Sequence, residues 1–173
     1  INYDDKVAAI ANCYECYGII YNKTILEGYC GMDGAVVKSI DEINNFDTLK
    51  AVVEDMQAKK DDLGITGVFA STSLLPGEDW RWQTHLANVP VYYEFKNNKV
   101  DLGSDATKKI KFQYGNEFKN IFDLYITDSV TDRKALGTKT VTDSMAEFAL
   151  EECAMVQNGN WAWGQVAGVS GNK

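Results

Sequence analysis

Aromatic, guanidinium, amide and carboxylate side chains gather at three places in the sequence. They follow or interrupt apolar runs, at Glu15, at residues 78–82 and at residues 158–163. Aromatic faces cover the C–H side of a sugar ring, while carboxylates, amides and guanidinium groups exchange hydrogen bonds with its hydroxyls. The candidate groups are Glu15, Glu78, Asp79, Trp80, Arg81, Trp82, Asn158, Asn160, Trp161 and Trp163. Together they favour an uncharged polyhydroxy ligand.

The tryptophans occur as two pairs, each with one intervening residue. Because side chains two positions apart on a helix point to different faces, we expect one member of each pair to be structural and one exposed. Trp82 continues a helical stripe through Leu86 and Val89. Trp80 and Arg81 are therefore preferred as ligand contacts over Trp82.

Composition indicates one compact domain spanning residues 1–173, and Ile1 begins without an initiator Met or signal peptide, as a cut end would. The net charge is -8 and the lysines are scattered. Nucleic acid is therefore excluded as a partner, and an anionic membrane would repel the chain. No apolar run approaches the roughly 18 residues of a spanning helix, so we expect membrane contact solely through a lipid anchor outside this chain.

The four cysteines, Cys13, Cys16, Cys30 and Cys153, include a lone CxxC, and His85 is the single histidine. A four-ligand zinc site is poorly supported by this set, so we expect no metal, no cofactor and small buried thiols. A Ser-His-Asp set is equally unsupported, and His85 is expected at the surface or rim. These patterns predict no catalytic residue.

Hydrophobic periodicity predicts alternating strands and helices. Strands are expected at 7–13, 17–21, 65–70 and 154–157, and helices at 47–60, 113–128, 142–152 and 161–166. The prediction also includes a capping box at Ser39 and Glu42 and a helical stripe interrupted at Pro90. Loops are expected at 28–34 and 71–79, and residues 96–109 are a polar surface segment of uncertain structure. The order indicates an α/β layer sandwich, in which ligands gather beyond the carboxyl ends of the strands.

Three segments resemble one family: YECYGIIYNKTIL (14–26), ITGVFASTS leading to GEDWRWQTHLAN, and FALEECAMVQNGNWAWGQV. They resemble the carbohydrate-binding extracellular solute-binding proteins of ABC importers, the maltose-binding type of periplasmic binding protein. The resemblance covers residues 7–171 and is weakest across 96–109. It implies a layered α/β lobe of the type II periplasmic binding protein fold, with helices packed on a short mixed sheet. The chain would be most of the C-terminal lobe, without the N-terminal lobe.

The resemblance also implies roles for individual residues. Glu15 would accept hydrogen bonds from sugar hydroxyls, and Trp163 would pack inward. Trp161 would stack on the ligand, and in a chain that lacks the other lobe it would face solvent. The expected ligand-binding site consists of Glu15, Trp80, Arg81, Asn158 and Trp161. The implied partners are a carbohydrate ligand and, in the full-length protein, an ABC transporter permease. The implied location is extracellular or at the cell surface as a bacterial lipoprotein, or periplasmic in a Gram-negative cell.

Two alternatives stay open. A glycoside-processing enzyme would use Glu15 with Glu78 or Asp79 as its carboxylate pair. A receptor of the same fold for a peptide or polyamine would exploit the acidic composition and aromatic walls. We expect a binding protein rather than an enzyme, with weak binding because a lone lobe contacts ligand from one side.

Overall fold

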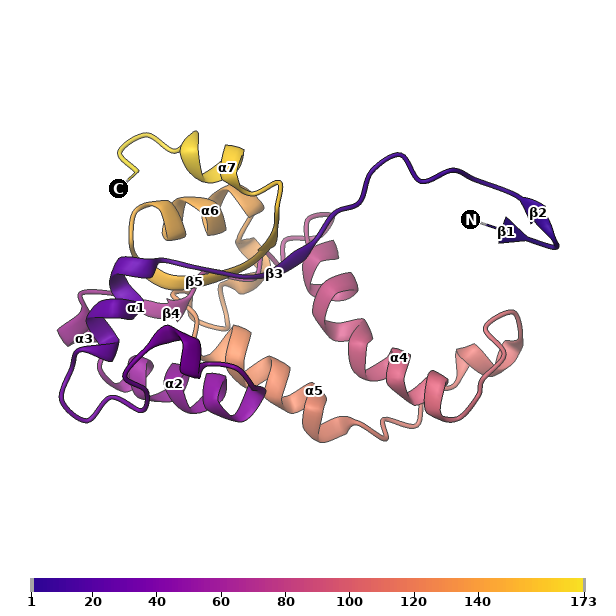
Figure 1. The fold of residues 1–173 in the computed structure, drawn as a ribbon, viewed down its shortest axis with the longest axis horizontal. Helices are drawn as coiled ribbons and strands as arrows, with labels where there is room; N and C mark the ends of the chain where they lie inside the picture. Colours follow the sequence, from indigo (N-terminus) through magenta and orange to yellow (C-terminus); the bar gives the residue numbers. More distant parts are fainter. Residues whose placement is uncertain (1, 173) are drawn as a thin grey trace.

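A three-stranded mixed sheet lies at the centre of the molecule, whose computed structural model describes residues 2–172 (Figure 1). The strand order is β3 (Tyr17–Tyr21), β5 (Cys153–Gly159), β4 (Gly67–Phe69). Strand β5 is antiparallel to β3 and parallel to β4. The register pairs Tyr17 with Gly159, so the start of β3 meets the end of β5. Ile1 and Lys173 lie outside the described residues.

One face of the sheet is covered by α1 (Lys23–Cys30), α2 (Phe46–Ala58) and α3 (Lys60–Leu63). Helix α2 begins where the Asn45 side chain accepts a hydrogen bond from the backbone N–H of Thr48, and its buried face carries Val52, Val53 and Met56. These side chains form the larger core cluster with Val68, Phe69 and Met155 of the sheet. Gly64 ends α3 with φ of 68°, a left-handed conformation that glycine adopts without strain.

The other face is covered by α6 (Val141–Ala149) and the short α7 (Trp163–Ala167). A capping box between Thr140 and Asp143 begins α6, and Met145 packs with Val156 of β5 in a second core cluster. The sheet is thus enclosed by helices on both faces. This arrangement confirms the predicted α/β class with helices packed on a short mixed sheet.

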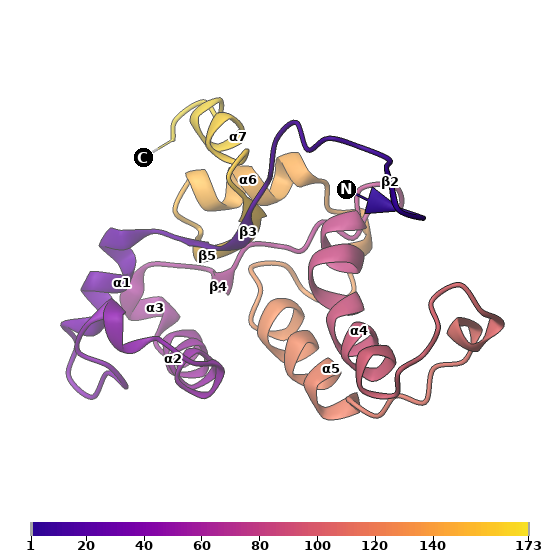
Figure 2. The ribbon, with the colours of Figure 1, turned by 45° about the vertical axis from the view of Figure 1, so that its right-hand side comes forward.

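A helical arm extends from the sheet. It comprises a π-helical turn (Trp82–Ala87), α4 (Asn88–Asn97), α5 (Gly115–Phe122) and a second π-helical turn (Asp123–Thr127). Both views place α4 and α5 side by side (Figures 1 and 2), and Trp82 meets Phe122 edge to face with ring centroids 4.9 Å apart. Pro90 was predicted to interrupt the helix, but the helix continues through it. It lies in the first turn of α4, where its missing N–H costs little after the wider π turn.

Short 3₁₀ turns occupy Ile40–Glu42, Asp105–Lys108 and Leu136–Thr138. A small hairpin of β1 (Asn2–Tyr3) and β2 (Lys6–Val7) lies far from the sheet, at the end of an extended N-terminal segment (Figure 1). The predicted strands at 17–21, 65–70 and 154–157 and the helix at 47–60 are confirmed in type.

Several local predictions were wrong. Residues 8–16 form no strand, and Cys13 and Cys16 are exposed there rather than buried. Residues 23–30 are helical rather than leading into a loop at 28, since Asn22 supplies an N-cap to α1. The α6 cap is Thr140, not Thr142, and α5 starts at 115 rather than 113. Phe122, expected inward, is partly exposed where α5 continues into the second π-helical turn.

Candidate functional site

Four rings from three segments form what we call the aromatic cluster: Tyr17, Trp80, His85 and Trp161. Tyr17 stacks on His85 with centroids 3.7 Å apart and an interplanar angle of 4°. Trp80 meets His85 at 89° and 5.3 Å, and Trp161 lies 6.3 Å from Trp80 and 6.1 Å from His85. The structure therefore brings together Trp80 and Trp161, two of the predicted stacking residues.

Arg81 is held behind this cluster by two contacts. Its guanidinium carbon lies 4.1 Å from the centroid of Trp80, and its Nε donates to Oδ1 of Asn158 over 3.1 Å. Burial holds the pKa of Arg81 below its usual range, and nearby Glu78 acts in the opposite direction. Among the described residues no partner binds the two terminal nitrogens of Arg81, so they can donate to a ligand hydroxyl.

Asn158 is fully buried, and its amide is used within the protein. Its Oδ1 accepts from Arg81 and from the backbone N–H of Gly159, and its Nδ2 donates to Oε1 of Gln165 over 3.1 Å. A ligand at the surface cannot reach such an amide directly. Asn158 was predicted to contact the ligand. In the structure it instead orients Arg81 and the turn.

The turn after β5 separates the two C-terminal tryptophans. The Trp161 ring is half-buried against Gly159, whereas Trp163 is 78% exposed at the start of α7. The predicted inward packing of Trp163 was wrong, because α7 is short and presents its first residue to solvent. One ring of this pair is covered and one is exposed, as expected. The covered ring is Trp161 and the exposed ring is Trp163, the reverse of the prediction.

The loop that carries Trp80 is anchored to α6. Glu147 is buried and its Oε2 accepts from the backbone N–H of Ser71 over 2.8 Å, while Ser144 Oγ donates to the backbone oxygen of Ser71 over 2.6 Å. At the far end of the loop, Oε2 of Glu78 accepts from the backbone N–H of Val141 over 2.6 Å. These bonds fix residues 71–79, and so the position from which Trp80 and Arg81 project.

Glu15 lies at the edge of the site, in the exposed segment before β3. The next residue, Cys16, is tied to the turn because its backbone oxygen accepts from the N–H of Asn160 over 2.9 Å. The described contacts do not bring the Glu15 carboxylate against the aromatic cluster.

Sequence reasoning missed Tyr17 and Gln157 as members of the site and underrated His85. Two signals point to them. His85 follows Arg81 by four residues, the spacing that places two side chains on one helical face, and Gln157 precedes Asn158 on β5, which meets the start of β3. Gln157 Nε2 lies 3.1 Å from Nδ1 of His85.

Other kinds of site find no support in the described chain. Residues 2–172 contain no group of three or more His, Cys, Asp or Glu side chains arranged to hold a metal ion. Within the same range, no helix is both long enough and apolar enough to cross a membrane.

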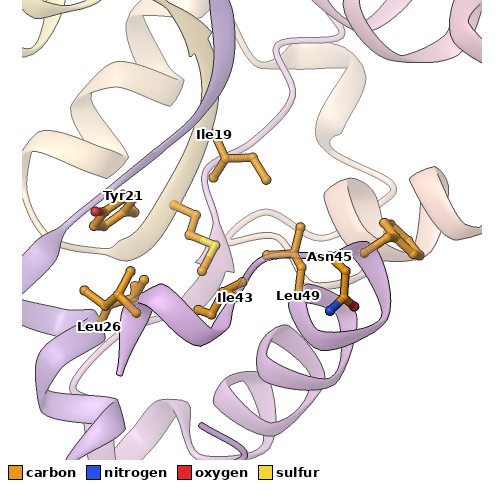
Figure 3. A pocket seen from close by; sticks show the side chains of 9 residues that line it. Ile19, Tyr21, Leu26, Ile43, Asn45 and Leu49 are labelled. Carbon is orange, nitrogen blue, oxygen red and sulfur yellow. The ribbon is translucent and has the colours of Figure 1, made fainter. Parts of the chain in front are cut away.

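A pocket of about 460 Å³ opens on a different part of the molecule, between β3, α1 and α2 (Figure 3). Its lining includes Ile19, Leu26, Ile43 and Leu49, with Asn45 among its few polar groups. It contains none of the predicted site residues. A sugar needs several hydrogen-bonding groups around its hydroxyls, so this apolar pocket fits such a ligand less well than the aromatic cluster.

The fold is that of a solute-binding protein lobe. In a comparison with solved structures, the chain is similar to "SBP RafE in complex with raffinose", with a TM-score of 0.52 and 20% sequence identity. The similarity covers 87% of this chain and 36% of that chain, so the present sequence spans about a third of the length of that protein. Neither the protein-family models nor the curated proteins gave a match.

Proposed function

We propose that this chain is the sugar-binding part of a solute-binding protein, with the aromatic cluster as its platform for a sugar ring. The observation that carries the proposal is the arrangement of Trp80, Trp161 and Arg81, which combines aromatic faces with free guanidinium donors. An aromatic ring beside a fork of N–H donors suits a ring of alternating C–H and O–H groups.

The proposal extends to the expected ligand contacts and biological setting. Trp161 and Trp80 stack on the sugar, Arg81 donates to its hydroxyls, Glu15 accepts from them at the rim, and Asn158 orients Arg81. The fold is consistent with a role in import. In this role the protein, lipid-anchored or periplasmic, delivers the ligand to the permease of an ABC importer outside the cytoplasmic membrane. In the structural neighbour the bound sugar is raffinose, which makes raffinose the first probe.

The binding experiment follows intrinsic tryptophan fluorescence during titration with raffinose and with maltooligosaccharides. The isolated chain is expected to bind in the millimolar range, about -4 kcal/mol, because contacts come from one side. Trp161→Ala is expected to raise Kd about tenfold, since one aromatic contact is worth about 1 kcal/mol or more. Trp163→Ala is the matched control, two residues away and exposed, and should bind as the parent does.

Two results would decide against sugar binding. A response to spermidine but to none of the sugars would favour the cation receptor. Turnover of chromogenic glycosides would favour an enzyme, although Glu78 already accepts from the Val141 backbone and Asp79 accepts from Gln83. A carboxylate so engaged is less available as a general acid or nucleophile.

A further inference from the structure

His85 lies at the centre of the aromatic cluster and touches groups from three other segments. Tyr17 of β3 is parallel to its ring at 3.7 Å, and Gln157 of β5 lies 3.1 Å from its Nδ1. Trp80 and Trp161 approach within 5.3 and 6.1 Å, measured between ring centroids. A change in the imidazole therefore alters the immediate surroundings of both tryptophans proposed to stack on sugar.

The orientation of the Gln157 amide fits the neutral form of His85. With its Nε2 3.1 Å from Nδ1 of His85, the Gln157 amide fits a neutral ring whose Nδ1 accepts and whose proton sits on Nε2. A second proton on Nδ1 would face that amide N–H group, and the amide would have to turn round to accept from it. The neutral imidazole is the state that the present geometry accommodates.

The charges around His85 act in the same sense. Burial, and then the positive charge of Arg81 on the same helix, hold the pKa of His85 below its usual value of 6.5, against a smaller opposing effect of the hydrogen bond with Gln157. The nearby carboxylates, Glu78 and Asp79, are engaged by Val141 and Gln83. From β3 the facing titratable group is the Tyr17 ring, with Glu15 two residues upstream, and from β5 the facing residue is the uncharged Gln157.

We propose that His85 is a positioning residue, which holds Tyr17 and Trp161 in place for the sugar and makes binding weaken in acidic solution. This inference rests on the proposed function. A sugar covering the rings removes more water from the imidazole, so the complex binds the second proton less tightly than the free protein. Affinity is then constant above the pKa of His85 in the free protein, and it falls by up to about tenfold per pH unit below that value.

The binding test compares two variants with the parent in raffinose titrations at pH 7.5 and at a pH below the midpoint of the His85 titration, which NMR measures. His85→Phe keeps a ring against Tyr17 but loses the contact with Gln157 and the titrating group. Its Kd should therefore rise about threefold at pH 7.5 and show no further loss in acid. His85→Ala removes the ring and should bind weakly at both pH values. Circular dichroism and thermal unfolding of each variant identify any that does not fold.

Two binding results would overturn the proposal: an acid loss that persists in His85→Phe, or parent-like affinity in His85→Ala. A third arm needs no sugar. Because His85 is the single histidine, its NMR signal can be followed alone during a pH titration. It should titrate below pH 6.5 and shift the ring signals of Tyr17 as it does. If no sugar binds at pH 7.5, the proposed function fails, and this titration still decides whether His85 positions Tyr17.

Discussion

The ring of Trp161 occupies the space that a side chain at Gly159 would need. A Cβ atom added to Gly159 would lie 2.2 Å from both Cη2 and Cζ3 of Trp161. The glycine of the Asn158-Gly159-Asn160 turn therefore does more than allow the chain to reverse. It forms the floor on which the proposed stacking tryptophan rests.

Gly159→Ala should displace the Trp161 ring and weaken sugar binding. The clash is with the far end of a side chain, so the ring moves and the strand persists, with a stability loss of about 1 kcal/mol. Kd for raffinose should rise about tenfold. Gly164→Ala in α7 is the control, since a Cβ there meets no heavy atom within 4 Å. Unchanged acrylamide quenching and affinity in Gly159→Ala would show that Trp161 does not depend on this floor.

Arg81→Lys should weaken raffinose binding even though it keeps the positive charge. Lysine keeps the positive charge but loses the planar face on Trp80 and the Nε bond to Asn158. We expect Kd for raffinose to rise about tenfold while the unfolding free energy falls by about 1 kcal/mol. Arg133→Lys, at an exposed position, serves as the control in the same titration and urea denaturation. Equal affinities for the two variants would remove Arg81 from the site.

The sequence predicts the general architecture because the core-forming elements carry strong signals. The apolar run at 65–70 and the stripe of Val52, Val53 and Met56 have one sensible placement, inside a covered sheet. The site is harder to predict, since Tyr17, His85 and Gln157 meet only through the pairing of β3 with β5 and the path of the π turn. The exchange of roles between Trp161 and Trp163 depends on backbone direction after the turn, which residue spacing does not specify.

Glu147→Gln should loosen the loop that carries Trp80 and Arg81. Both carboxylate oxygens accept hydrogen bonds, Oε2 from the Ser71 backbone and Oε1 from Thr131 and Lys139, so an amide would turn an N–H group toward a donor. The expected loss is about 2–3 kcal/mol of unfolding free energy by urea denaturation.

Raffinose affinity should decrease in the same Glu147→Gln variant, because the loop between Ser71 and Trp80 loses its anchor. Glu152→Gln, exposed three residues after α6, should change stability by no more than about 0.5 kcal/mol. A Glu147→Gln protein as stable as this control would contradict the anchoring role.

Asp128 should make the protein less stable at neutral pH than at mildly acidic pH. Burial, and then the negative charges of Glu54 and Asp123, raise its pKa from 3.8 to about 6. The folded state therefore binds the proton more tightly than the unfolded chain. Its stabilising contribution is complete below about pH 4 and is lost as the pH rises through about 6.

Asp128→Asn removes this titration while keeping the backbone bonds that Asp128 makes to Phe69 and Asp123. At pH 7 the variant should be more stable than the parent by about 1 kcal/mol, allowing for solvent screening, which corresponds to roughly 2–4 °C in Tm. The difference should shrink through pH 6 to 4 and vanish below that, where the parent carboxyl is neutral in both states. Thermal unfolding across this range measures it, with Asp33→Asn as an exposed control. A variant that is less stable than the parent at pH 7 would mean that the ionised Asp128 is stabilised by its surroundings, contrary to its burial beside two other carboxylates.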